Sequence, residues 1–153
     1  TQLLKEIKKE IKKASDKDEK IAFRLNGTSD IDFLYLLNKN LYFDIELLNY
    51  DKVYFYDYTK SIARAKRYKD FRNYTLTFSK SETNDKEVKE ALNLGINVAA
   101  VFKDNLPQKY KGVKVIDGDL SDLEMLKHKN IILGLKAKGD AKKDTTGFVI
   151  TNY

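Results

Sequence analysis

Segments with the pattern of β-strands alternate with segments of helical periodicity along this 153-residue chain. The mostly apolar segment 96–102 is typical of a parallel strand that is buried on both faces. Strand–helix alternation repeated about five times predicts a mainly parallel sheet with right-handed crossover connections. We therefore expect an α/β fold with about five to six strands and flanking helices. The pattern allows either an open, Rossmann-like sheet or a partial β/α barrel.

The expected elements follow from residue periodicity and from the residues at their ends. Asp30 is a candidate helix cap, Gly95 suits the end of a helix, and Ser121 with Glu124 has the spacing of a capping box. Strands are expected at residues 21–25, 53–56, 74–78, 96–102, 113–116 and 131–135, with an edge or hairpin strand at 148–150. Helices are expected at residues 2–14, 31–37, 44–49, 61–71 and 85–94, with a short helix after Ser121.

Residues 1–20 are expected to form an N-terminal amphipathic basic helix ahead of a single α/β domain, residues 21–153. Apolar residues from Leu3 to Ala14 recur at helical spacing, and lysines occupy the other face. This helix either serves as a basic arm for nucleic acid or packs its apolar stripe on the domain. Because the chain begins at Thr1 rather than Met, we expect it to be trimmed or to be one part of a longer protein.

The composition excludes several classes of chemistry. The chain has no cysteine, which excludes disulfides, thiol catalysis and an iron–sulfur cluster held by this chain. Its single histidine, His128, argues against a histidine-rich metal site and against a Ser-His-Asp triad. The apolar runs are too short to span a membrane, and the lysine-rich start lacks the apolar core of a signal peptide. We therefore expect a cytoplasmic protein with no membrane partner.

Small polar clusters follow five of the expected strands. They are residues 28–30, 57–60, 79–81, 117–119 and 136–138. Because the carboxyl ends of parallel strands share one edge of the sheet, and ligands bind at that edge, we expect these clusters to meet. This pattern indicates a site without specifying its chemistry.

Carboxylates in these clusters are candidate metal ligands. Asp30, Asp57, Asp117 and Asp119 could supply oxygen atoms to Mg²⁺ or Mn²⁺, which would suit phosphoryl transfer or phosphodiester hydrolysis. The alternative is structural: Asp117-Gly118-Asp119 forms a tight turn, and its carboxylates cap the following helix. Asp30 would then be only a helix cap.

Basic residues near the strand ends are candidate contacts for phosphate. Lys136 and Lys138 project from one face if the strand continues that far, and Lys60, Arg64 and Arg67 follow another strand. Lysine would contact the nucleic-acid backbone as a point charge rather than read bases. The net charge of +6 raises the expectation of an acidic partner such as nucleic acid. The alternatives are that the positive charge reflects a genome that places lysine on every exposed face, and that residues 136–138 form a solvated loop.

Tyr56 and Tyr58 lie on one side of their expected strand because side chains alternate. Interleaved with the basic residues, they could stack on the bases of single-stranded nucleic acid. The alternative is that they pack beneath helices with their hydroxyls at the rim.

Several phrases together resemble a family of phage and mobile-element proteins named after a mycobacteriophage product, gene product eighty-eight. The phrases are Arg24–Ile31, Phe55–Lys60, Asn73–Ser79, Gly95–Phe102, Val115–Asp119 and Gly134–Gly139, followed by Gly147–Val149. The resemblance covers roughly residues 21–150 and implies the cytoplasm of a host cell as the setting.

The resemblance also implies a difference from longer members of that family. Those members carry a cysteine-containing segment upstream of the Asn-Gly-Thr-Ser-Asp phrase, and that segment is similar to the start of a radical S-adenosylmethionine barrel. Here the same region is a lysine-rich helix without cysteine. If the chain is complete, cluster-dependent radical chemistry is excluded for it. The chain is either a fragment of a longer protein or a shortened relative whose degenerate enzyme scaffold is repurposed for binding.

Two functions are compatible with these observations. The first is a protein that binds or acts on nucleic acid or nucleotides at the carboxyl ends of its strands, with Mg²⁺ or Mn²⁺ as a candidate cofactor. The alternative is a non-enzymatic protein that binds a host or phage protein and inhibits a host defence system. Its contacts would then lie on the helix at residues 2–14 or on the basic segment 61–72.

Overall fold

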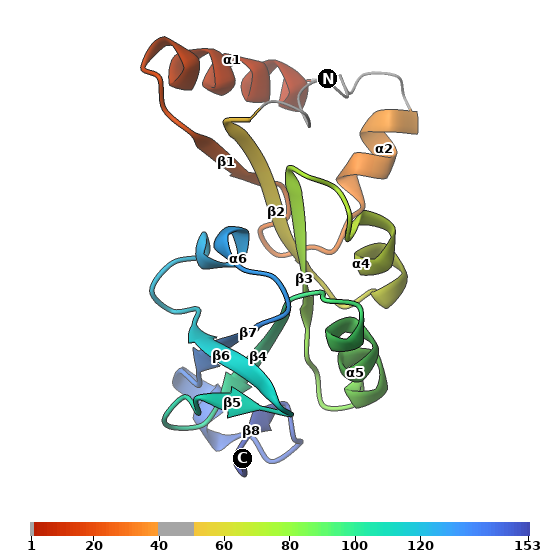
Figure 1. Cartoon of the computed structure of the whole chain (residues 1–153), viewed down its shortest axis with the longest axis vertical. Coiled ribbons are helices and arrows are strands. Elements are labelled where there is room, and N and C mark those ends of the chain that lie inside the picture. The colour runs from red at the N-terminus through yellow and green to blue at the C-terminus, as the bar shows by residue number, and fades with distance from the viewer. Residues whose placement is uncertain (1, 40–50) are drawn as a thin grey trace. The chain divides into compact units, whose positions relative to one another are not determined.

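The computed structural model describes residues 2–39 and 51–153 of the chain (Figure 1). These residues form a mixed α/β fold with an eight-stranded, mostly parallel sheet, which confirms the expected class. Strand β5 (Lys109–Tyr110) lies outside the expected strands because its two residues are too few to show a periodic pattern, whereas β8 (Val149–Ile150) lies within the strand expected at residues 148–150. The open, Rossmann-like sheet and the partial β/α barrel both stay predictions. The helix expected at residues 44–49 lies outside the described residues.

The chain divides into two compact units. Unit 1 contains residues 1–57 and 70–75, and unit 2 contains residues 58–69 and 76–153. Strands β2 (Val53–Thr59) and β3 (Tyr74–Ser79) contribute residues to both units. The domain boundary expected at residue 20 therefore lies inside unit 1.

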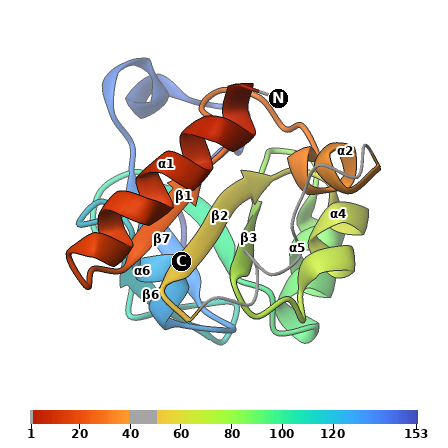
Figure 2. The same cartoon turned by 90° about the horizontal axis from the view of Figure 1, so that it is seen from above.

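In unit 1, helix α1 (Gln2–Asp16) leads into strand β1 (Ile21–Arg24), which runs parallel to β2 (Figure 2). Leu4, Ile7 and Ala14 of the helix's apolar stripe are each less than a tenth exposed, and Leu3 and Ile11 are half-buried. This burial favours the packing role of the helix over that of a free basic arm. The register pairs Phe23 with Phe55, and their rings stack with centroids 5.4 Å apart.

Helix α2 (Phe33–Lys39) begins later than the sequence pattern indicated. Asp32 caps it, because its Oδ1 accepts a hydrogen bond from the backbone nitrogen of Tyr35 at 3.0 Å. The prediction that Asp30 caps this helix is therefore wrong.

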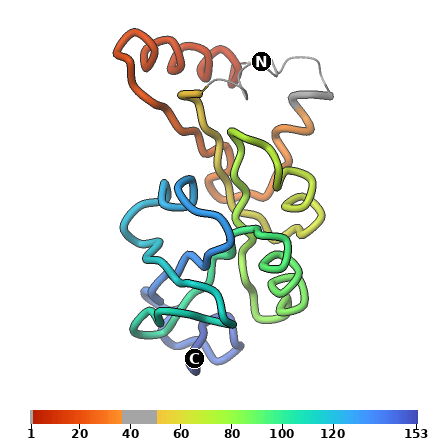
Figure 3. The backbone as a smooth tube through the Cα atoms, viewed as in Figure 1, coloured from red at the N-terminus to blue at the C-terminus, as the bar shows by residue number. Residues whose placement is uncertain are grey.

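In unit 2, strand β4 (Val98–Phe102) lies inside a sheet with the order β3–β4–β7–β6–β5. Strands β7 (Ile132–Lys136) and β6 (Val113–Asp117) run parallel to one another, and β7 runs parallel to β4. The short strand β5 is antiparallel to β6. The backbone tube in Figure 3 follows the chain from β7 through the 3₁₀ helix Gly139–Lys143 to the C-terminus.

The second edge of β4 is shared by two strands. Strand β3 pairs with its first residues, Val98 and Ala99, and β8 pairs with its last residues, Val101 and Phe102. Because β8 runs parallel to β4, the hairpin alternative for residues 148–150 is wrong. The edge of β4 therefore changes partner at the point where β3 ends.

Helices α4 (Ile62–Tyr68) and α5 (Asp85–Asn93) lie side by side on the sheet of unit 2 (Figures 1 and 2). Apolar residues of α5, such as Val88 and Ala91, join Phe78, Phe102 and Ile132 of the strands in one buried cluster. The backbone leaves α5 through Gly95 at a φ of +74°, as expected for a glycine after a helix.

The short helix α6 (Glu124–Lys127) lacks the expected capping box. The hydroxyl of Ser121 accepts a hydrogen bond from the backbone nitrogen of Leu123, and the Glu124 carboxylate accepts one from the Lys127 amine at 2.7 Å. The spacing was correct, but the Glu124 carboxylate pairs with the lysine that follows it on the helix. None of the helices in the described ranges is long and apolar enough to cross a membrane.

Candidate functional site

The carboxyl ends of β4, β6 and β7 share one edge of the sheet in unit 2. The register pairs Phe102 of β4 with Lys136 of β7, and Asp117 of β6 with Gly134 of β7. Because these strands are parallel neighbours, the segments that follow them leave from the same edge. The structure therefore brings together the clusters 117–119 and 136–138.

Asp119 links the ends of β6 and β7. Its Oδ2 accepts a hydrogen bond from the backbone nitrogen of Lys136, and its Oδ1 accepts one from the Lys138 amine, each at 2.8 Å. The hydrogen bond from Lys138, followed by the backbone bond from Lys136, holds the pKa of Asp119 below its usual range. Both oxygens of this carboxylate are thus occupied. The structural alternative, in which the Asp119 carboxylate caps the following helix, is therefore wrong for this residue.

A pocket of about 430 Å³ opens at this edge; we call it the strand-end pocket. Its lining residues are Asn105, Leu106, Pro107 and Gln108 after β4, Val115 and Asp117 of β6, and Lys136 of β7. The apolar side chains come from two segments, the loop after β4 and strand β6, and the polar side chains come from these two segments and from β7. Its volume lies within the range typical of small-molecule sites.

The polar side chains of the strand-end pocket are available for a ligand. Asp117 Oδ1 accepts a hydrogen bond from the backbone nitrogen of Asp119 at 2.9 Å. Within residues 2–39 and 51–153, Asp117 Oδ2, the Lys136 amine and the side-chain amides of Asn105 and Gln108 form no hydrogen bond or ion pair. Lys138 differs from Lys136 in this respect, since its amine is paired with Asp119. The pocket therefore offers one amine, one carboxylate oxygen and two amides.

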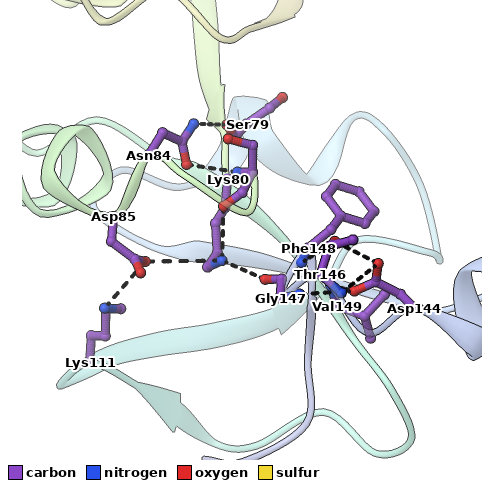
Figure 4. A network of polar contacts seen from close by, with 11 residues as sticks. Ser79, Lys80, Asn84, Asp85, Lys111, Asp144, Thr146, Gly147, Phe148 and Val149 are labelled. Atoms are coloured by element: carbon purple, nitrogen blue, oxygen red, sulfur yellow. Dashed lines mark hydrogen bonds and ion pairs between the residues drawn. The ribbon is translucent and has the colours of Figure 1, made fainter.

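The cluster Ser79-Lys80-Ser81 forms a second polar network, at the point where β3 ends (Figure 4). The Lys80 side chain is 5% exposed. Its amine donates to the backbone oxygens of Ser81 at 3.0 Å and Gly147 at 3.2 Å, and lies 4.0 Å from Asp85. Lys80 therefore ties the end of β3 to the segment that leads into β8.

The loop before β8 is organised by Asp144 (Figure 4). Its carboxylate accepts hydrogen bonds from the backbone nitrogens of Val149 at 3.0 Å and Gly147 at 3.2 Å, and from the Thr146 hydroxyl at 2.7 Å. These hydrogen bonds lower the pKa of Asp144, and the bond from the Val149 nitrogen has the largest effect. They place the Gly147 carbonyl where Lys80 binds it. The lysine network is thus a structural fastening of β8.

In unit 1, Asp57 is a buried carboxylate with a dedicated partner. It is 1% exposed, and it accepts hydrogen bonds from the backbone nitrogen of Asn26 at 3.2 Å and from its side-chain amide at 2.7 Å. The Asn26 amide also holds the loop that follows, since its oxygen accepts from the Ser29 hydroxyl and the Ile31 nitrogen. Asp30 is exposed on that loop. This arrangement indicates a structural role for the Asn-Gly-Thr-Ser-Asp phrase.

The predicted metal ligands are thus divided between the units. Asp30 and Asp57 belong to unit 1, and Asp117 and Asp119 belong to unit 2. Among the residues that the structure describes, no group of three or more His, Cys, Asp or Glu side chains gathers in a way that could hold a metal ion. A divalent ion at Asp117 would need oxygen ligands of other kinds, such as the amides beside it.

The three basic residues predicted after β2 as phosphate contacts differ in their exposure. Lys60 and Arg67 are exposed, and the Arg67 guanidinium lies 5.9 Å from the centre of the Tyr68 ring. Arg64 is 4% exposed because its position on α4 faces the interior, so it does not lie on the basic surface that the sequence suggested. Of these three predicted contacts, Lys60 and Arg67 could contact a ligand without rearrangement of the helix, and Arg64 could not.

The tyrosines of β2 are half-buried, and they alternate with fully buried neighbours. Tyr56 belongs to unit 1 and Tyr58 to unit 2. The Tyr58 hydroxyl donates a hydrogen bond to Asp122 at 3.2 Å. This contact favours the alternative in which the ring packs and its hydroxyl lies at the rim.

Sequence reasoning missed several residues of these networks. Asn97 directly precedes β4, and its side-chain amide donates hydrogen bonds to the backbone oxygens of Met125 at 3.2 Å and His128 at 2.8 Å. Its signal was one amide inside an otherwise apolar segment. Asn105 and Gln108 gave no signal, because they flank the lone Pro107 in a loop of ordinary polarity.

Comparison with known proteins gives one match. Residues 1–152 match the family described as Gene product 88, which confirms the resemblance and extends it to the N-terminal helix. No curated protein and no solved structure matches the chain.

Proposed function

The chain belongs to the Gene product 88 family, a phage-type gene product family, and we propose that it binds nucleic acid or nucleotides at the carboxyl ends of β4, β6 and β7. The observation that carries this proposal is the strand-end pocket with its unpaired Lys136 amine. In parallel α/β sheets, ligands bind outside the carboxyl ends of the strands.

Charge supports an anionic ligand. The chain has a net charge of +6, and the exposed Lys136 amine forms no ion pair with a carboxylate of the described residues. A lysine amine contacts a phosphate as a compact charge with three donors. Lys138 contributes less in this proposal, because its charge is offset by Asp119.

A divalent ion is a candidate cofactor of the same pocket. Asp117 Oδ2 and the amide oxygens of Asn105 and Gln108 are oxygen donors, the type that Mg²⁺ and Mn²⁺ prefer. Mg²⁺ sites in proteins commonly use one or two carboxylates together with phosphate oxygens of the substrate. The metal would therefore join the site together with a phosphate.

The test is the binding of labelled single- and double-stranded DNA and RNA across a salt series, with and without Mn²⁺. We expect affinity to fall as salt rises, because phosphate contacts release counterions. Lys136→Ala should weaken binding to all sequences and reduce the slope of log K against log salt by about one. Loss of full-length probe only with Mn²⁺ would indicate an enzyme.

The matched control is Lys114→Ala. Lys114 is an exposed lysine on β6 of the same unit, but it lies away from the strand end, opposite Lys109 of β5. The two variants lower the net charge equally. An equal loss of nucleic-acid affinity would therefore mean that Lys136 acts only through the overall charge of the protein. No binding at low salt would overturn the proposal and direct the search to protein partners.

A further inference from the structure

We propose that the strand-end pocket receives one unpaired nucleobase, so that the protein selects single-stranded over double-stranded nucleic acid. This inference rests on the proposed function and specifies its ligand. Three observations carry it. They are the apolar walls of the pocket, the arrangement of its polar groups, and Gly134, which allows the two walls to approach one another.

The walls are suited to a flat apolar surface. Leu106 and Pro107 line one side and Val115 of β6 lines another. Gly134 lies behind them, and a Cβ atom built on it would be 2.8 Å from both the Leu106 and the Val115 side chains. Because no side chain occupies this position, Leu106 can settle against β6 and β7 and form the floor. A nucleobase has a π-face that can lie on such a surface whatever its sequence.

The polar groups are arranged for a base and its phosphate rather than for a phosphate alone. Without a bound divalent ion, the Asp117 carboxylate would repel a phosphate that entered the pocket, but it can accept a hydrogen bond from an amino or imino group of a base. The amides of Asn105 and Gln108 can donate to and accept from the same edge. Lys136, exposed at the end of β7, is the group suited to the phosphate.

Selection of single strands follows from this arrangement. A base inside a duplex presents neither its face nor its Watson–Crick edge, so it would have to be unstacked and unpaired before it could enter. That cost is small for a single strand. The pocket, about 430 Å³ in volume, is open to solvent, so an unpaired base has access to its walls.

The experiment compares a short single-stranded oligonucleotide with one of the same length and charge that contains only abasic sites. We expect the intact oligonucleotide to bind about tenfold more tightly, the ratio that corresponds to ~1.4 kcal/mol. Leu106→Ala should reduce this ratio toward one. Asp117→Asn keeps an oxygen that can accept from the Asp119 nitrogen and should also reduce the ratio, with little effect on folding.

Leu120→Ala is the control, because Leu120 is an exposed leucine of unit 2 that does not line the pocket. It should leave the ratio unchanged. Equal, salt-dependent binding of intact and abasic strands would overturn the base pocket and leave the proposed function intact. Failure of both strands to bind would overturn the proposed function as well. A duplex that binds as tightly as the intact single strand would also contradict the inference.

Discussion

The Lys138 amine lies 2.8 Å from Oδ1 of Asp119, and this contact fastens the segment after β7 to the segment after β6. The second oxygen of Asp119 holds the backbone of Lys136. One carboxylate thus fixes the chain at the lysine that we assign to phosphate, and neutralises the lysine beside it. This relationship makes the two strand-end lysines chemically different although their sequence positions are similar.

The first prediction concerns Asp119→Asn. Loss of the charge should lower the free energy of unfolding at neutral pH by about 1 kcal/mol, because an ion pair and a charge-assisted hydrogen bond are weakened. The freed Lys138 amine should strengthen nucleic-acid binding. Urea unfolding and the salt-series binding assay measure the two effects, and a variant that binds more weakly than wild type would contradict this account of Lys138.

The stabilising effect of Asp119 should depend on pH with a defined sign. The folded state lowers the pKa of Asp119, so the carboxylate stabilises the fold above the unfolded pKa of about 3.9. This stabilisation is lost as the pH falls below that value and through the lower folded pKa. The difference in unfolding free energy between wild type and Asp119→Asn should therefore be constant near neutrality and should shrink below about pH 4.

The second prediction concerns Asn26→Ala in unit 1. Removing the amide leaves the buried Asp57 carboxylate with one fewer donor and frees the loop that Asn26 holds. We expect a loss of about 2–3 kcal/mol in the free energy of unfolding, measured with urea. Thr28→Ala, at an exposed position of the same loop, should change it by less than about 0.5 kcal/mol. Similar losses in the two variants would mean that Asn26 has no special structural role.

The third prediction concerns Lys80→Met. The substitution preserves most of the apolar stem but leaves the carbonyls of Ser81 and Gly147 without the amine. We expect a loss of about 1–3 kcal/mol. Hydrogen exchange should accelerate at the Lys103 amide, which bonds to the Ile150 carbonyl at 3.0 Å, because β8 is less firmly held.

Lys111→Met is the control for this experiment. The Lys111 amine lies 3.6 Å from Oδ1 of Asp85, the same oxygen that the Lys80 amine approaches, but the Lys111 side chain is 38% exposed. Its removal should change the unfolding free energy by about 0.5 kcal/mol or less. If both lysine variants leave exchange at Lys103 unchanged, Lys80 does not fasten β8.

The fourth prediction concerns Gly134→Ala. The new Cβ would press on Leu106 and Val115, so we expect a loss of about 1–3 kcal/mol in stability from overpacking. Displacement of Leu106 should also weaken binding of the intact oligonucleotide more than binding of the abasic one. Gly27→Ala is the control, since nothing lies within 4 Å of a Cβ at that position. Equal melting temperatures for the two variants would contradict the close packing described at Gly134.

Local pattern was sufficient to predict much of the fold. The stripe from Leu4 to Ala14, the alternation in β2 and the glycine after α5 each depend on neighbouring residues, and each predicted its element correctly. Local pattern failed where a competing partner was nearby, as at Glu124, which pairs with Lys127 instead of closing a capping box. It also failed for β5, whose two residues are too few to have a period.

The sequence by itself determined the α/β class, the main helices and strands, and the edge of the sheet at which polar residues collect. Only the tertiary structure decided which of these residues are available to a ligand. Asp57 and Asp119 have partners distant in sequence, whereas Asp117 Oδ2 and the side-chain amine of Lys136 have none within the described residues. The physical reason is that hydrogen-bond partners and packed walls, such as Leu106 against Gly134, come from segments far apart in the chain, and sequence periodicity does not record those contacts.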